Sequence, residues 1–210
     1  MMSPESNMAT HKREDDLTLL LRTLAFAARK HRHQRRKDAR GLPYINHPIG
    51  LANVLLSEGG IFDIQVLCAS ILHDTLEDTS ATRAELTELF GEKISDIVVE
   101  VTDDKRLSKR ERKRLQIEHA AQLCPEAKLV KLADKICNLR DVLASPPVGW
   151  SRSRKREYFE WAKQVVDGLR GSNSALETVF DDIYTQIPTP SHLPNPVNIL
   201  RRLFSRNTPR

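Results

Sequence analysis

Long hydrophobic runs are missing from this 210-residue chain. No apolar stretch approaches the roughly 20 residues that a helix needs to cross a bilayer, so we expect no membrane span. The segment MMSPESNMATHKREDD at the start also lacks the apolar region of a secretory signal. The sequence therefore predicts a cytoplasmic protein.

Cysteine is scarce. The three cysteines, Cys68, Cys124 and Cys137, are odd in number and scattered, and no CxxC pair occurs. This pattern does not fit a disulfide framework. Two of the three lie in apolar runs, so we expect small buried thiols in a reducing compartment.

The formal net charge of +5 is less informative than it looks. From residue 186 to the end the only charged groups are four arginines, which carry +4 of the total and leave the rest of the chain nearly neutral. That distribution disfavours a nucleic-acid partner. Positive charge within the body gathers at residues 29–37 and 105–114. Such runs are most often solvated helix faces, but two local clusters also suit a small, highly phosphorylated ligand.

Strand and hairpin signals are absent as well, and we find no internal repeat. Apolar residues recur instead at helical spacing, with Asp63 and Thr82 as expected N-caps and Gly91 as a stop. We expect an all-α orthogonal bundle of roughly eight or more helices. The expected helices cover residues 17–31, 48–58, 63–78, 82–90, 92–102, 106–123, 125–143, 151–169 and 173–187.

The domain organisation follows from the ends of this pattern. Residues 1–14 show no apolar periodicity and are expected to form a flexible N-terminal tail. Residues 15–186 suit one compact domain. Residues 187–210 are rich in proline, end in a basic stretch and are expected to be a loosely packed tail.

The most informative segment is ILHDTLEDT, which holds the pairs His73-Asp74 and Glu77-Asp78. If it is helical, residues four apart share a face, so four polar groups crowd an apolar helix. Burying them costs several kcal/mol unless each is paired or binds a metal. The alternative is an acidic helix end with a solvated histidine, but the preceding VLCASIL is typical of a core helix.

Two further residues fit the same metal. His47 precedes Pro48, which pushes it out of the helical region and predicts that it forms a helix N-cap. Asp134 stands within the apolar stripe of residues 125–143, where an aspartate needs a partner. The predicted ligand set is His47, His73, Asp74 and Asp134. The remaining histidines are expected to be solvated: His11, His31, His33, His119 and His192.

The order His47, His73-Asp74, Asp134 resembles the signature of the HD-domain metal-dependent phosphohydrolases. Several segments are similar to the small stand-alone (p)ppGpp hydrolases of the RelA/SpoT family, of the metazoan SpoT homologue type. They are RKDARGLPYINHPIGLANVL, ILHDTLEDT, VTDDKRLSKRERKRLQ, AKLVKLADKICNLRD and GWSRSRKREYFEWAKQVV. The resemblance covers residues 17–185 and assigns residues 15–186 to an HD-type domain.

The resemblance implies a guanosine-3′,5′-bis(diphosphate) 3′-pyrophosphohydrolase that releases pyrophosphate and GDP or GTP. It also implies one Mn²⁺ ion, although two imidazoles and two carboxylates do not exclude Zn²⁺ or Fe²⁺. Glu77 and Asp78 match the family's catalytic pair, which positions and deprotonates the attacking water. Solvation at a helix end is the alternative for this pair, but negative charge there is unfavourable.

A small nucleotide is the expected partner, and the oligomeric state cannot be inferred from the sequence. The resemblance places Arg36 and Lys37 beside the base, and Asn138 and Tyr158 beside the sugar or base. Composition and position suggest three phosphate-binding cations. These are Lys109, Arg112 and Arg154. Any single cation of this kind is more often a surface residue than a ligand contact.

Two other functions stay open. A phosphatase that removes the 2′-phosphate of NADPH would use the same metal, carboxylates and cations. A non-catalytic HD-type nucleotide sensor belongs to another class, and it predicts loss of a metal ligand or of the Glu77-Asp78 pair. All of these residues are present here.

Overall fold

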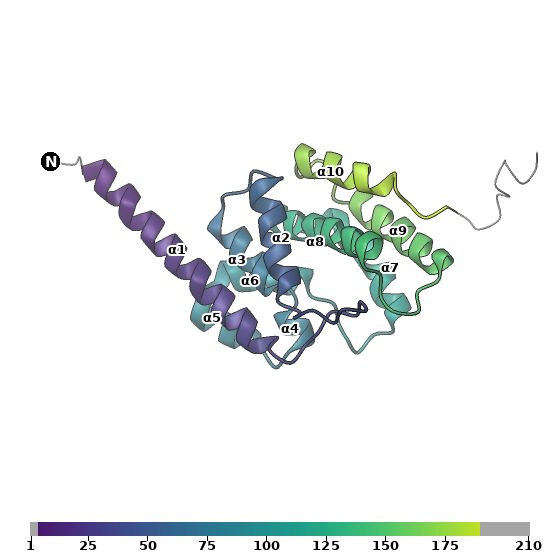
Figure 1. Ribbon diagram of the computed structural model, residues 1–210. Helices are drawn as coiled ribbons and strands as arrows, with labels where there is room; N and C mark the ends of the chain where they lie inside the picture. Colours follow the sequence, from purple (N-terminus) through teal and green to yellow (C-terminus); the bar gives the residue numbers. More distant parts are fainter. Residues whose placement is uncertain (1–3, 190–210) are drawn as a thin grey trace, which may run out of the picture.

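The computed structural model describes residues 4–189, in which ten α-helices, one 3₁₀ helix and no strand occur. This confirms the predicted all-α class. Figure 1 shows the arrangement. In chain order the helices are α1 (Pro4–Lys30), α2 (Asn46–Ser57), α3 (Ile64–Leu72), α4 (Thr75–Asp78), α5 (Arg83–Phe90), α6 (Glu92–Val101), α7 (Lys109–His119), the 3₁₀ helix η1 (Ala120–Gln122), α8 (Pro125–Ala144), α9 (Arg152–Asp167) and α10 (Ser174–Tyr184).

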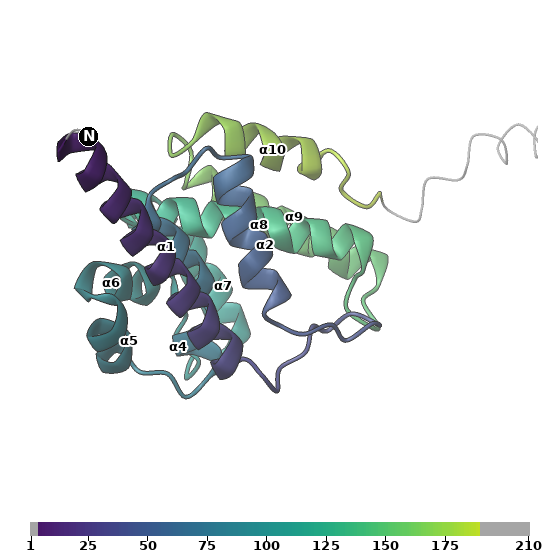
Figure 2. The same ribbon diagram turned by 60° about the vertical axis from the view of Figure 1, so that its left-hand side comes forward.

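Two helices form the centre of the bundle. Helix α3 packs against α1, α2, α6 and α8, and every residue from Val66 to Leu72 is buried. Helix α8 packs in turn against α2, α6, α9 and α10, and Figures 1 and 2 show it running through the middle of the molecule. Its Leu132 and Ile136 are fully buried. The end of α3 and the middle of α8 therefore meet inside the protein, where polar side chains need partners.

The predicted caps at Asp63 and Thr82 are confirmed. The Asp63 carboxylate accepts a hydrogen bond from the Gln65 amide at 2.8 Å, and the Thr82 hydroxyl accepts one from the Glu85 amide at 3.2 Å. Each bond satisfies an amide of the first helical turn that has no partner within the helix. Gly91, at φ 87°, ends α5 as predicted.

The first helix differs from the prediction. It begins at Pro4 rather than near Leu17, so residues 4–14 are helical and not an irregular tail. Figures 1 and 2 show this end of α1 projecting beyond the bundle. The side chains of residues 12–15 are exposed, and a helical stretch with exposed side chains needs no apolar stripe.

At the other end of the described chain, α10 finishes at Tyr184, close to the predicted end of the domain. Residues 190–210, which include most of the predicted basic tail, lie outside the described residues. No helix within residues 4–189 is both long and apolar enough to span a membrane.

Candidate metal and nucleotide site

Three residues from different helices bring metal-binding atoms together. One donor atom from each of His47, His73 and Asp134 lies within 4.8 Å of the other two. His47 comes from α2, His73 follows the last residue of α3, and Asp134 stands in the middle of α8. Asp134 Oδ1 is 3.3 Å from His47 Nε2 and 3.9 Å from His73 Nε2. The structure thus brings together three of the four residues that the sequence predicts as metal ligands.

The segment that carries His73 and Asp74 is not one continuous helix, as the prediction for residues 63–78 had it. Helix α3 ends at Leu72, and α4 starts only at Thr75. The hydroxyl of Thr75 donates to the Leu72 carbonyl at 2.7 Å, an alternative to the regular helical bond. His73 and Asp74 therefore lie at a break between helices, where both side chains reach the same site.

The prediction that His47 caps a helix is also wrong. Helix α2 begins at Asn46, and its N-cap is Ile45. Pro48 is accommodated because the first helical turn does not use that amide in an intrahelical bond. The backbone amide of His47 instead donates to the Tyr44 carbonyl at 3.0 Å. The imidazole is buried, with 6% of the residue exposed.

The environment of His73 fits a bound cation. Its Nδ1 lies 2.8 Å from the Ser70 carbonyl oxygen, which can only accept, so Nδ1 carries the hydrogen. The buried Nε2 has no hydrogen-bond partner, although Asp74 Oδ2 is 2.9 Å away. A nitrogen lone pair and a carboxylate oxygen at that separation repel each other unless a proton or a metal ion stands between them.

The electrostatic field at this point favours positive charge. Burial lowers the pKa of His73, but the carboxylates of Asp74 and Asp134 outweigh it and raise that pKa to about 9. Burial acts against ionised Asp134, yet the pKa of this carboxyl lies well below its usual value because Lys135 and the two imidazoles stabilise the charge. Ionised carboxylates beside imidazoles are a suitable donor set for a divalent metal.

Neighbouring side chains fix the two carboxylates. Lys135 Nζ donates to Asp134 Oδ2 at 2.9 Å, and the Asn138 amide donates to Asp134 Oδ1 at 2.6 Å. The Tyr44 hydroxyl donates to Asp74 Oδ2. The sequence analysis missed Tyr44 and Lys135, although each stands within three residues of a predicted ligand.

The predicted catalytic pair is anchored by cations from the next part of the chain. Arg112 Nη1 donates to Glu77 Oε1 at 3.2 Å, and the Asp103 amide donates to Glu77 Oε2 at 3.3 Å. Lys105 forms an ion pair with Asp78. Burial, followed by the negative charge of Asp103, raises the pKa of Glu77 above its usual value. A carboxylate with a raised pKa is a better proton acceptor.

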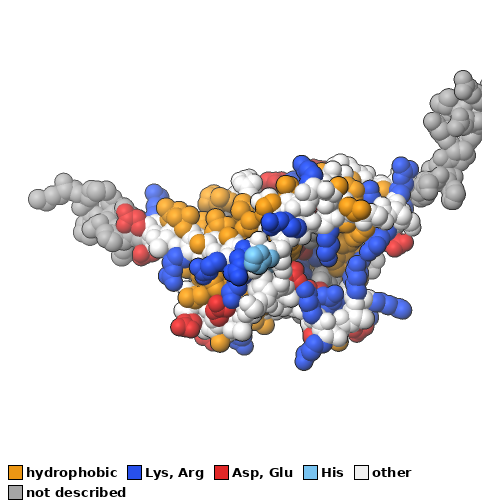
Figure 3. Space-filling model, turned by 60° about the horizontal axis from the view of Figure 1, so that its bottom comes forward, with side chains coloured by type: hydrophobic (Ala, Val, Ile, Leu, Met, Phe, Trp, Pro, Cys, Tyr) orange, Lys and Arg blue, Asp and Glu red, His pale blue; other side chains and the backbone are white. Residues whose placement is uncertain are grey.

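A cavity of about 660 Å³ opens onto this site. On the face shown in Figure 3, Lys and Arg side chains gather around a hollow. Both His47 and Asp78 line the cavity. Five of the predicted substrate-binding residues line it as well: Arg36, Lys37, Lys109, Asn138 and Tyr158.

The other two predicted phosphate contacts lie elsewhere. Arg112 does not line this cavity, because its guanidinium is directed to Glu77. Arg154 lines a second, adjoining cavity and stacks on Trp150, with Cζ 4.8 Å from the ring centroid. Arg36 lines the main cavity but also pairs with Asp141.

His31 is a further correction, because the sequence analysis expected it to be solvated. Only 2% of the residue is exposed, and its ring lies 4.9 Å from that of Tyr44. Its Nδ1 is 2.5 Å from the side-chain oxygen of Gln34, whose amide nitrogen donates to the Asp78 carbonyl. His31 thus supports the wall of the site. The sequence did not indicate this burial, because His31 stands among the charged residues RKHRHQRRK and a single buried side chain produces no periodic pattern.

Comparisons with known proteins point to one family. The HD domain family matches residues 23–160. The guanosine-3′,5′-bis(diphosphate) 3′-pyrophosphohydrolase MESH1 of Xenopus tropicalis is 56% identical over 169 residues, which cover 80% of this chain and 94% of that protein. The protein of the same name from Homo sapiens is 58% identical over 167 residues, with 80% and 93% covered.

One solved structure is similar to this chain over most of its length. It is described as a metazoan ortholog of SpoT that hydrolyses ppGpp and plays a role in starvation responses. Its TM-score with this chain is 0.78 at 50% sequence identity, and the match covers 80% of this chain and 94% of that one.

Proposed function

The chain belongs to the HD domain family, and on that premise we propose that it is a metal-dependent 3′-pyrophosphohydrolase of (p)ppGpp. The observation that carries the proposal is the convergence of His47, His73 and Asp134, with His47 also lining a cavity that is rich in Lys and Arg. Relatives above 50% identity named for this activity support the choice of substrate.

Four residues would hold the metal, for which we propose Mn²⁺: His47, His73, Asp74 and Asp134. At such a site a divalent ion lowers the pKa of a water and polarises a phosphate oxygen. The protein itself would orient the side chains that bind the metal. The Ser70 carbonyl fixes the His73 tautomer, and the Tyr44 hydroxyl holds one oxygen of Asp74. Zn²⁺ and Fe²⁺ are the competing ions for this donor set.

Glu77 is the proposed general base, with Asp78 as its partner in positioning the water. Glu77 takes a proton from water as the oxygen attacks the phosphorus joined to the 3′-oxygen. The bond from phosphorus to the 3′-oxygen breaks, pyrophosphate leaves with the new oxygen, and the 3′-oxygen takes up a proton. Such proton transfer contributes about 10²–10⁴-fold to rate.

The cations of the main cavity would hold the nucleotide. Arg36 lies over the Tyr44 ring, with Cζ 5.5 Å from the centroid, and Lys37 lines the same wall, which suits them to the base side. Asn138 and Tyr158 line the same cavity, where we propose that they contact the sugar or base.

The 2′-phosphatase activity on NADPH is the second candidate. The same carboxylates and the same cation-lined cavity would serve a phosphomonoester on a larger nucleotide. A sensor without catalysis is less well supported, because Glu77 is half-buried and is held by two hydrogen bonds, from the Asp103 amide and from Arg112.

The test is turnover of ppGpp and NADPH by the full chain after chelator treatment, with Mn²⁺, Zn²⁺ or Fe²⁺ then added back. We expect pyrophosphate and GDP from ppGpp, restored best by Mn²⁺. Release of phosphate from NADPH alone would favour the second candidate. Binding of ppGpp without any product would favour the sensor and contradict the proposal.

A further inference from the structure

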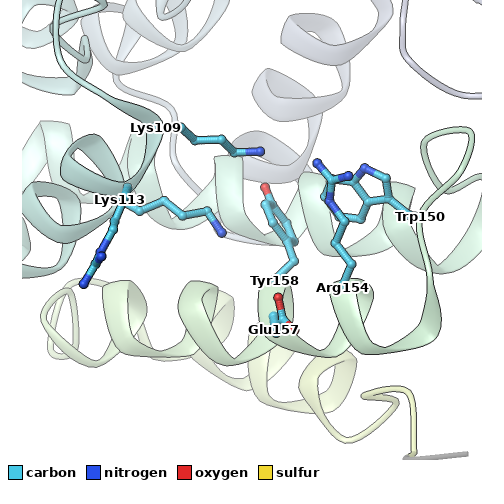
Figure 4. A pocket seen from close by; sticks show the side chains of 7 residues that line it. Lys109, Lys113, Trp150, Arg154, Glu157 and Tyr158 are labelled. Atoms are coloured by element: carbon cyan, nitrogen blue, oxygen red, sulfur yellow. The ribbon is translucent and has the colours of Figure 1, made fainter.

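A second cavity of about 420 Å³ adjoins the main one and shares Lys109, Trp150 and Tyr158 with it. Figure 4 shows Lys109 and Lys113 extending from α7 toward Tyr158, while Arg154 lies against Trp150. His47 and Asp78 line the main cavity only. The second cavity is therefore reached from the part of the main cavity that holds Tyr158.

The cations of this second cavity are not neutralised. The lining has four cations, Lys109, Arg110, Lys113 and Arg154, and no residue of the described chain forms an ion pair with any of them. Arg112 and Lys105, by contrast, are paired with the catalytic carboxylates. The lining contains one acid, Glu157, whose carboxylate accepts a hydrogen bond from Ser153 at 3.1 Å. Several unpaired cations around one cavity favour a ligand with more than one negative charge.

Among these four cations, Lys113 is the one that lies against two aromatic rings of α9. Its Nζ lies 4.4 Å from the ring centroid of Trp161 and 5.3 Å from that of Tyr158. Burial, together with the charges of Lys109 and Lys135, lowers the pKa of Lys113 to about 8. An anion bound in the cavity would stabilise the charged form of Lys113 and so act against this lowering of its pKa. The aromatic rings hold the ammonium in place without neutralising it.

The proposed function decides which part of a nucleotide reaches this cavity. The scissile 3′-ester must lie near His47 and Glu77, and the base is assigned to Arg36 and Lys37. The 5′-phosphates are the remaining anionic part of the substrate. They would project past Tyr158, where the second cavity begins.

We propose that the second cavity binds the 5′-phosphates and that Lys113 is a specificity-determining residue for them. This rests on the proposed function and extends it, because Lys113 would act on the 5′-phosphates and not on the scissile 3′-diphosphate.

The test compares ppGpp with guanosine 3′-diphosphate, which carries no 5′-phosphate. In Lys113→Met, which keeps an apolar side chain against Trp161, we expect KM for ppGpp to rise about tenfold, the value of one charge-assisted hydrogen bond. The KM for guanosine 3′-diphosphate should stay the same, as should kcat for both. Lys113→Arg keeps the charge and should restore KM for ppGpp.

Lys155→Met is the control for loss of a lysine, because Lys155 stands in α9 but lines neither cavity, and it should leave both substrates unaffected. An equal rise of KM for the two substrates would overturn the proposal, because the cavity would then serve the 3′-diphosphate. An unchanged KM for ppGpp would also overturn it. Dissociation constants of the two ligands, measured by calorimetry, make the same comparison without turnover. They separate failure of this inference from failure of the proposed function.

Discussion

Arg112 Nη1 lies 3.2 Å from Glu77 Oε1, so this arginine of helix α7 holds the proposed general base rather than the substrate. The two side chains are about one-fifth exposed, at 23% and 18%. The Nε of Arg112 is buried and has no hydrogen-bond partner. Glu77 is thus oriented from two sides, by this guanidinium and by the Asp103 amide.

The first prediction concerns this contact. Arg112→Met should lower kcat for ppGpp by about tenfold or more, because Glu77 loses its orientation. This is a part of the rate enhancement that general-base catalysis provides. KM should change little. Steady-state kinetics measures both values. Arg106→Met is the matched control, since Arg106 pairs with Asp104 at the surface and should be neutral. A rise in KM with unchanged kcat would show that Arg112 binds phosphate after all.

The second prediction is the pH dependence. Glu77 must be ionised to accept a proton, and burial raises its pKa above the usual 4.5. Activity should therefore fall as pH drops through a value above 4.5, and it should be constant at higher pH until another group titrates. In Arg112→Met the loss of a nearby cation should shift this acid limb to still higher pH. A pH profile of kcat/KM with an unmoved limb in that variant would contradict the assignment.

The third prediction concerns the orientation of the metal-binding carboxylate. Tyr44→Phe removes the hydroxyl that donates to Asp74 and keeps the ring. We expect the dissociation constant for Mn²⁺ to rise about tenfold, as for other hydrogen-bond partners of metal ligands. Calorimetric titration of the metal-free protein measures it. Tyr184→Phe, whose ring stacks on Phe180 in α10, should bind Mn²⁺ like the wild type. Equal Mn²⁺ affinities in the wild type and both variants would show that the Tyr44 hydroxyl does not orient a metal ligand.

The fourth prediction concerns stability. A Cβ added at Gly168 would lie 2.7 Å from the Ala120 Cβ, closer than two carbon atoms can approach. Gly168→Ala should therefore lower the free energy of unfolding by about 1–3 kcal/mol, the usual cost of overpacking. A Cβ at Gly50, within α2, meets nothing within 4 Å. Gly50→Ala should be neutral or stabilising by up to about 1 kcal/mol, because alanine favours the helix. Urea denaturation of both variants tests the pair.

The features that sequence patterns predicted correctly are those that depend on interactions between residues close together in the chain. The caps at Asp63 and Thr82 were identified because a capping side chain bonds an amide two or three residues away. The convergence of His47, His73 and Asp134 was accessible because each interrupts an apolar pattern, and buried polar groups need partners.

What the sequence analysis missed depends on contacts between distant segments. Arg112 and Lys109 stand in one basic run, yet only the packing of α7 decides that the first reaches Glu77 and the second a cavity. His31 is buried by Tyr44, which no periodicity of its own segment indicates. The helix break at His73 is accompanied by a bond from the Thr75 hydroxyl to the Leu72 carbonyl, and the apolar pattern of the segment did not indicate it.

The central claim is that Glu77 acts as the general base and is not a metal ligand. The variant Glu77→Gln tests this claim most directly. Its Mn²⁺ content and its turnover of ppGpp should be measured on the same preparation. We expect one ion per chain, as in the wild type, with kcat reduced by about 10²-fold or more. Turnover close to the wild-type rate, or loss of the metal together with activity, would contradict the account.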